Sequence, residues 1–168
     1  MYQPVVYERA PSYNSETVNE VYNECESTII YHLEQLNQKT SVLGKRIQRD
    51  LIDFTIRRAQ GYSRKVHYIE EGFEPKDCDR EHVIPAKVLR DELIRGNLTI
   101  QNCFDSPICY LSKDKHKQLK KNGYASIVPD LDYFFKRYTN LFDISILDYQ
   151  TKNKVDLNLT LDKHFEKE

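Results

Sequence analysis

The stretch CDREHVIPAKVL, residues 78–89, decides how the centre of this chain is interpreted. It places an acid, Glu81, directly before an imidazole, His82, on a short apolar segment that Pro85 ends. Neighbouring residues of a strand point to opposite faces, so these two side chains cannot simply form a local pair. Two different polar groups held on a short strand indicate chemistry rather than packing.

The residues after this strand indicate a helix, a loop, a second strand and another helix. Pro85 suits a first helical turn, and the pattern AKVLRDELIRG continues to Gly96, a natural C-cap. The segment NLTIQNCFDSP has the composition of a loop, and PICYL has that of a strand. Ser112 then caps a helix with the sequence SKDKHKQLKKNG, which Gly123 ends. Residues 62–80, upstream, are typical of a strand or of irregular chain.

Two long helical patterns precede this centre and predict a helical hairpin over residues 15–61. The first starts near Ser15, with apolar residues at helical spacing: Val18, Val21, Tyr22, Cys25, Ile29, Leu33 and Leu36. The second is capped by Thr40 or Ser41 and has an apolar stripe of Leu43, Ile47, Leu51 and Phe54. We expect the two stripes to pack against each other. The sequence leaves open whether this hairpin binds DNA, a protein partner or a second copy of the chain.

The second helical pattern also contains basic residues, namely Lys45, Arg46, Arg49, Arg57 and Arg58. A solvated charged face and a phosphate-binding face are about equally favoured for them. Towards the C-terminus, residues 131–141 indicate a helix, and DISIL and KVDLNLTL alternate around TKNK as in a β-hairpin. We therefore expect an α+β fold forming a single domain over residues 1–168, with a C-terminal helix and β-hairpin over residues 131–168.

The composition limits the classes of protein and partner. Charged residues make up 30% of the chain but the net charge is only −1, so any nucleic-acid surface is a local patch. The first residues, MYQPVVYERAPSYN, have no apolar run for a signal peptide or a membrane span, which predicts a cytoplasmic protein without a membrane partner. The four cysteines form no CxxC pair, which argues against a disulfide scaffold and a zinc knuckle and favours reduced, mostly buried thiols.

The centre of the chain resembles the HNH, or ββα-metal, endonucleases over about residues 78–121. In that family a β-hairpin and a helix clasp one divalent metal. The first strand carries a ligand followed by the general-base histidine, often as (D/E/H)-H-x-x-P, and here this is Glu81-His82-Val83-Ile84-Pro85. The resemblance implies a ββα-metal core over residues 78–123 in a DNA endonuclease of the kind found in phage, mobile-element or restriction contexts.

The resemblance also implies a role for each site residue. Glu81 and His116 are the expected ligands of one divalent cation, Mg²⁺ or Mn²⁺, and His82 is the expected general base. The motif asparagine is best matched by Asn97 in GNL, and Asn102 is second. No structural zinc is expected.

The chemistry of phosphodiester hydrolysis agrees with these roles. It requires an activated water and a cation to neutralise charge on the phosphate. A neutral histidine with a pKa of roughly 6.5 can accept the proton of that water. If Glu81 and His116 bind one cation, a carboxylate oxygen and an imidazole nitrogen must come within roughly 4 Å of each other. This requires the CYL and EHV strands to pair antiparallel, with the following helix lying across the EHV strand.

The helix around His116 is rich in lysine, which favours a nucleic-acid partner. Lys113, Lys117 and Lys120 are the expected phosphate contacts, and Arg80 is either another one or the partner of a nearby aspartate. Taken alone, this helix is more typical of a solvated surface, and the upstream EHVIP motif favours the nuclease. The alternative is a catalytically silent nucleic-acid- or protein-binding module that retains the ββα shape. Only the nuclease requires Glu81, His82 and His116 to converge.

Overall fold

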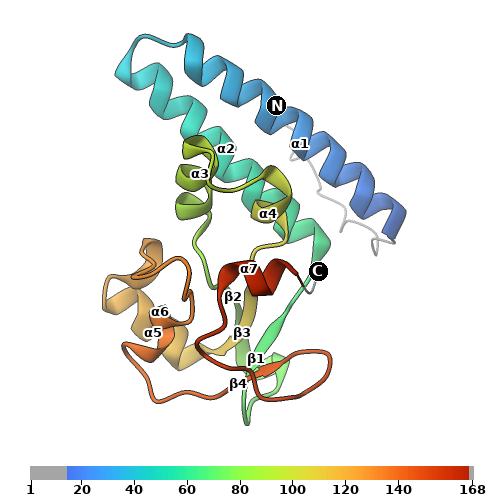
Figure 1. Cartoon of the computed structure of the whole chain (residues 1–168), viewed down its shortest axis with the longest axis vertical. Helices are drawn as coiled ribbons and strands as arrows, with labels where there is room; N and C mark the ends of the chain where they lie inside the picture. Colours follow the sequence, from blue (N-terminus) through green and yellow to red (C-terminus); the bar gives the residue numbers. More distant parts are fainter. Residues whose placement is uncertain (1–14, 167–168) are drawn as a thin grey trace, which may run out of the picture.

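Residues 15–166, which the computed structural model describes, form an α+β fold with a four-stranded mixed sheet (Figure 1). The two long helices α1 (Ser15–Gln38) and α2 (Val42–Ser63) form a hairpin at one end of the molecule. The sheet lies at the other end together with the short helices α5 (Lys113–Lys121) and α6 (Lys136–Thr139). The expectation about a signal peptide in residues 1–14 lies outside the described residues.

The predicted inward stripe of α1 is confirmed, but that of α2 is wrong. Cys25, Ile29 and Leu36 of α1 are buried. On α2, by contrast, Leu43 and Phe54 are 67% and 60% exposed. The buried residues of α2 are Ile52, Thr55, Ile56, Ala59 and Gln60. Because α2 packs against α3 (Ala86–Arg95) and α4 (Ile100–Phe104) as well as α1, its inward face is set by three neighbours, which the stripe alone did not reveal.

The sheet brings together strands that are far apart in the chain, in the order β2-β3-β1-β4. Strands β2 (Cys78–His82) and β3 (Ile108–Ser112) pair antiparallel, with Glu81 opposite Cys109, as the sequence predicted. Strand β1 (Tyr68–Glu70) pairs parallel with β3, and β4 (Ile146–Asp148) pairs antiparallel with β1 at the edge. A short 3-10 turn, η1 (Pro75–Asp77), leads into β2.

The connection between β2 and β3 contains two helices, of which the sequence predicted one. Helix α3 ends at Gly96 as predicted, in the left-handed conformation that favours glycine. The segment predicted as a loop contains α4, whose first turn is closed by a capping box between Thr99 and Asn102. After β3, helix α5 (Lys113–Lys121) begins directly at Ser112, which occupies the N-cap position without a side-chain hydrogen bond.

The C-terminal prediction holds only in part. The helix expected over 131–141 is reduced to α6 (Lys136–Thr139), which follows the 3-10 turn η2 (Tyr124–Ser126) and a series of turns. The second strand of the expected β-hairpin is reduced to a single bridge between Leu147 and Lys154. The Asp156 carboxylate accepts a hydrogen bond from the Asn158 amide, and such local bonds favour turns over strands. Thr160 then caps α7 (Leu161–Phe165).

The core lies between the helices and the sheet, and all four cysteines are buried and free, as predicted. Residues of this core include Ile56 of α2, Leu89 of α3, Leu111 of β3 and Phe135 beside α6. Within residues 15–166, none of the helices is both long and apolar enough to cross a membrane.

Candidate metal and catalytic site

Helix α5 places His116 between two carboxylates of β2. Asp79 and Glu81 are two residues apart on the strand, so both point to the face that α5 covers. The His116 ring contacts Asp79 Oδ2 through Nδ1 at 2.6 Å and Glu81 Oε2 through Nε2 at 2.8 Å. The hydrogen bond to His116 lowers the pKa of Asp79, and nearby lysines lower it further. The predicted proximity of Glu81 and His116 is therefore confirmed.

A buried arginine from α6 completes this cluster. Arg137 is 1% exposed and its Nη1 lies 2.6 Å from Glu81 Oε1. The same nitrogen donates to the backbone carbonyls of His82 and Val83, at 2.6 and 3.1 Å. Nε and Nη2 donate to the carbonyl of Tyr124. Arg137 thus neutralises Glu81 and also holds the end of β2 in position.

His82 and Glu81 line one small cavity of about 90 Å³. Its other lining residues are Arg57, Pro85, Ala86, Ala125 and Arg137. Nε2 of His82 is buried and has no hydrogen-bond partner among residues 15–166. Burial, followed by the nearby positive charges of Arg80 and Arg57, lowers the pKa of His82 to about 4. The imidazole is therefore neutral at neutral pH and able to accept a proton.

The separation of Glu81 and His116 suits two ligands of one small cation. Ligand atoms at adjacent corners of an octahedron with bonds of about 2.1 Å are about 3 Å apart, close to the observed 2.8 Å. Within the described part of the chain, no group of three or more His, Cys, Asp or Glu side chains has a geometry that could hold a metal.

The structure does not bring the predicted asparagines to this site. Asn97 follows α3 and donates to Glu92 Oε2 at 2.7 Å, whereas Asn102 caps α4. Both lie in the helical connection between the strands, and neither forms a hydrogen bond with His82 among the described residues. The role of Asn97 in orienting His82 has no support in these contacts.

Arg80 has a different partner from either of those expected. It is on the opposite face of β2 from Glu81, and its Nη2 donates to the backbone carbonyls of Gln60 and Lys65, at 2.7 and 3.0 Å. These bonds attach the C-terminal end of α2 to β2. Arg80 is therefore engaged in holding the fold, and contact with phosphate would require it to leave these carbonyls.

The lysines of α5 divide into two groups. Lys113, Lys117 and Lys120 are exposed, as a phosphate contact requires. Lys115 is half-buried and forms an ion pair with Glu70, which is 3% exposed in β1. The Glu70 carboxylate also accepts a hydrogen bond from the Ser112 amide at the start of α5. Lys115 is thus part of the attachment of α5 to the sheet.

Two residues of the cluster were not identified from the sequence. Asp79 is detectable in principle, because alternation along a strand places it on the same face as Glu81. Arg137 has no sequence signal of its own, since it comes from a segment remote in the chain from β2.

Comparison of this chain with models of protein families, with curated proteins and with solved structures finds no match.

Proposed function

We propose that this protein is a metal-dependent endonuclease of the HNH (ββα-metal) type that hydrolyses phosphodiester bonds in DNA. The observation that supports this function best is the meeting of Glu81 and His116 at 2.8 Å beside His82. Glu81, one member of this pair, also lines the small cavity that holds the neutral imidazole of His82. Hydrolysis of a phosphodiester requires both a cation and a base.

In the proposed mechanism each residue has a separate task. His82 accepts the proton of the attacking water at Nε2, the buried ring nitrogen that has no other partner in residues 15–166. Glu81 and His116 would hold Mg²⁺ or Mn²⁺, which when bound neutralises the charge that develops on the phosphate. Arg137 forms an ion pair with Glu81 and donates a hydrogen bond to the backbone carbonyl of His82. The exposed Lys113, Lys117 and Lys120 are proposed to contact the DNA backbone.

Asp79 is proposed to orient His116. With Nδ1–H donated to Asp79, Nε2 is the nitrogen that would bind the cation beside Glu81, in place of the proton between Nε2 and Glu81 Oε2. Carboxylates that bond the second nitrogen of a ligand histidine commonly fix its tautomer in this way. Asp79 is thus a positioning residue that need not touch the substrate.

A second candidate function is favoured by the ion pair between Arg137 and Glu81. Since Arg137 and His116 already contact both oxygens of the Glu81 carboxylate, the cluster is satisfied without a cation. A catalytically silent module that binds nucleic acid or protein has the same contacts. Binding of Mn²⁺, measured by calorimetry on the wild-type protein and on His116→Ala, separates the two functions.

The decisive experiment is plasmid cleavage with Mg²⁺ or Mn²⁺, and with EDTA. We expect cleavage only with the metal, and a rate about 10²- to 10⁴-fold lower for His82→Ala, the typical contribution of a general base. Binding of DNA by His82→Ala should remain close to that of the wild type, because a general base acts in the transition state.

The matched control is His32→Ala, which removes a half-buried histidine of α1 that bonds Gln48. This variant should cleave at the wild-type rate. A His82→Ala protein that is folded and cleaves as fast as the wild type would exclude His82 as the base and contradict the mechanism.

A further inference from the structure

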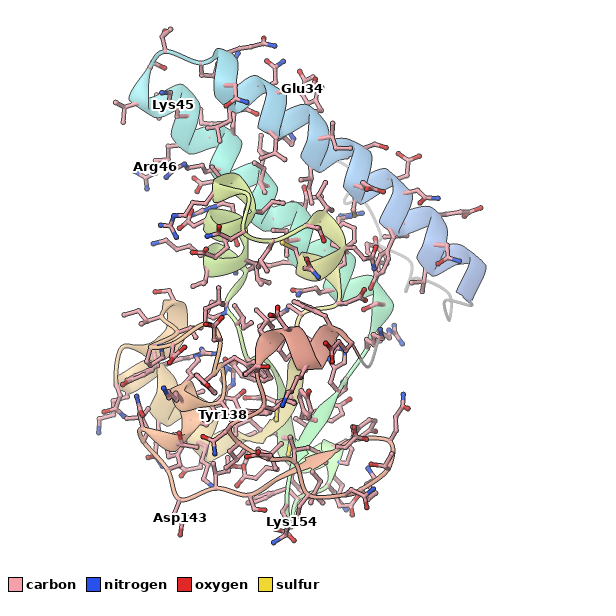
Figure 2. The ribbon with its side chains drawn as sticks, viewed as in Figure 1. Glu34, Lys45, Arg46, Tyr138, Asp143 and Lys154 are labelled. Carbon is pink, nitrogen blue, oxygen red and sulfur yellow. The ribbon has the colours of Figure 1, made fainter. Side chains whose placement is uncertain are left out.

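A basic groove lies next to the catalytic cavity and is formed by α2, the start of α3 and η2. Its volume is about 660 Å³. The positive side chains lining it are Lys45, Arg46, Arg49, Arg57, Lys87 and Arg90, and the negative ones are Asp50 and Asp53. In Figure 2, Lys45 and Arg46 project from α2 on the side away from α1. Such an excess of positive charge is notable in a chain whose net charge is −1.

The groove is continuous with the cavity that contains His82. Arg57, Pro85 and Ala125 line both of them. A polymer whose scissile phosphate lies in the small cavity would therefore have its neighbouring phosphates beside α2. This continuity connects the groove to the proposed chemistry. A solvated basic surface elsewhere on the molecule would have no such connection.

Three of the six basic side chains have no counter-ion within the described residues. Arg46 and Arg57 each pair with an aspartate one helical turn away, and Arg90 pairs with Asp91. Lys45, Arg49 and Lys87 form no ion pair or side-chain hydrogen bond in residues 15–166. They contribute nothing to holding the fold through such contacts, and they are free to pair with phosphates of a ligand.

We propose that this basic groove binds the DNA backbone on one side of the scissile phosphate, so that α2 of the helical hairpin is a substrate-binding helix. The inference rests on the proposed endonuclease function and assigns the hairpin a task in it. Phosphate contacts fix the position of DNA without reading its sequence, so the groove sets where the backbone lies and not which bases are cut.

The test is the salt dependence of DNA binding, measured by fluorescence anisotropy with a short labelled duplex. The variant Lys45→Gln/Arg49→Gln/Lys87→Gln is made in the His82→Ala background, so that no DNA is cut during the measurement. We expect weaker binding and a log–log salt slope smaller by about two to three units, since each lost phosphate contact removes about 0.9.

A matched control removes three positive charges that do not line the groove, in Lys152→Gln/Lys154→Gln/Lys163→Gln. Figure 2 shows Lys154 at the opposite end of the molecule from Lys45. This control should keep the slope of the parent protein. An unchanged slope in the groove variant, or an equal decrease in both variants, would overturn the proposal.

Cleavage assays with His82 restored separate this inference from the proposed function. We expect the groove variant to have a higher KM with little change in kcat, because uniform binding is lost. If the groove variant keeps both its salt slope and its KM while His82→Ala abolishes cleavage, the groove proposal fails and the endonuclease stands. If His82→Ala cleaves normally, the mechanism fails whatever the groove does.

Discussion

The surroundings of His82 determine its charge. An exposed histidine is partly protonated near neutrality, and burial beside Arg80 and Arg57 removes that charge by lowering the pKa to about 4. The imidazole is then neutral throughout the physiological range. The same shift makes the stability of the protein depend on pH.

We predict that this dependence disappears in His82→Asn. Between the folded pKa of about 4 and the unfolded value of roughly 6.5, the unfolded chain binds a proton that the folded protein does not. The contribution of neutral His82 to the free energy of unfolding is therefore fully present above about pH 6.5 and is lost as the pH falls towards 4. Between about pH 7 and about pH 5, the free energy of unfolding should fall by about 2 kcal/mol more in the wild type than in the variant.

Urea unfolding in the presence of EDTA at both pH values measures this difference directly. Comparing the two proteins cancels the contribution of all other titrating groups. Equal losses of stability in the wild type and in His82→Asn would show that His82 titrates normally in the folded protein.

For individual residues, the sequence allowed part of the candidate site to be predicted. The resemblance of the EHVIP motif and the following helix to HNH endonucleases predicted that Glu81 and His116 meet, and they do. The partners of these residues depend on tertiary contacts. Arg137 reaches Glu81 from α6, and no local pattern encodes that contact. Asn97 instead bonds Glu92, five residues earlier at the end of α3.

Among the elements, α5 determines whether the site forms at all. It must lie across β2 for His116 to reach Glu81, and the buried carboxylate of Glu70 fixes its first turns. That carboxylate accepts a hydrogen bond from the Ser112 amide and forms an ion pair with the Lys115 ammonium. The orientation of α5 thus depends on β1, a strand that takes no direct part in the proposed chemistry.

We predict that Lys115→Met destabilises the protein by roughly 3–5 kcal/mol, because it leaves the charge of Glu70 buried without its partner. Lys117→Met is the control on the same helix, since Lys117 is exposed, and it should change stability by less than about 0.5 kcal/mol. The free energy of unfolding in urea measures both. Similar values for the two variants would mean that the ion pair does not hold α5 on the sheet.

The helices also differ in how well their own sequences predicted them. Helices α1, α3 and α5 were predicted because each has an amphipathic pattern or clear end signals. Helix α4 was missed because its five residues are too few to show a period, although its capping box is visible once the helix is known. The face of α2 was predicted wrongly because three neighbours, rather than its apolar stripe, decide which side is buried.

Across the whole molecule, the last helix joins segments that are remote in sequence. His164 of α7 is buried, and its Nδ1 lies 2.7 Å from the Tyr68 hydroxyl of β1. Its Nε2 lies 2.9 Å from the carbonyl oxygen of Asp105, between α4 and β3. The ring also packs against Phe134 and Phe165. Figure 1 shows α7 between the helical part of the molecule and the sheet.

We predict that His164→Ala lowers the free energy of unfolding by roughly 2–5 kcal/mol, the range for removing a large buried side chain. The loss includes a cavity among the aromatic rings, a hydrogen bond to the buried Tyr68 hydroxyl and one to the half-buried carbonyl of Asp105. Lys163→Ala, an exposed neighbour on the same helix, should stay within about 0.5 kcal/mol of the wild type. Urea unfolding followed by circular dichroism measures both variants. His164 contacts β1, which pairs with β3 in the sheet that also contains β2. His164→Ala should therefore lose the proposed DNA cleavage at a lower urea concentration than Lys163→Ala. Equal urea midpoints for the two variants would show that α7 is not needed to hold the helices against the sheet.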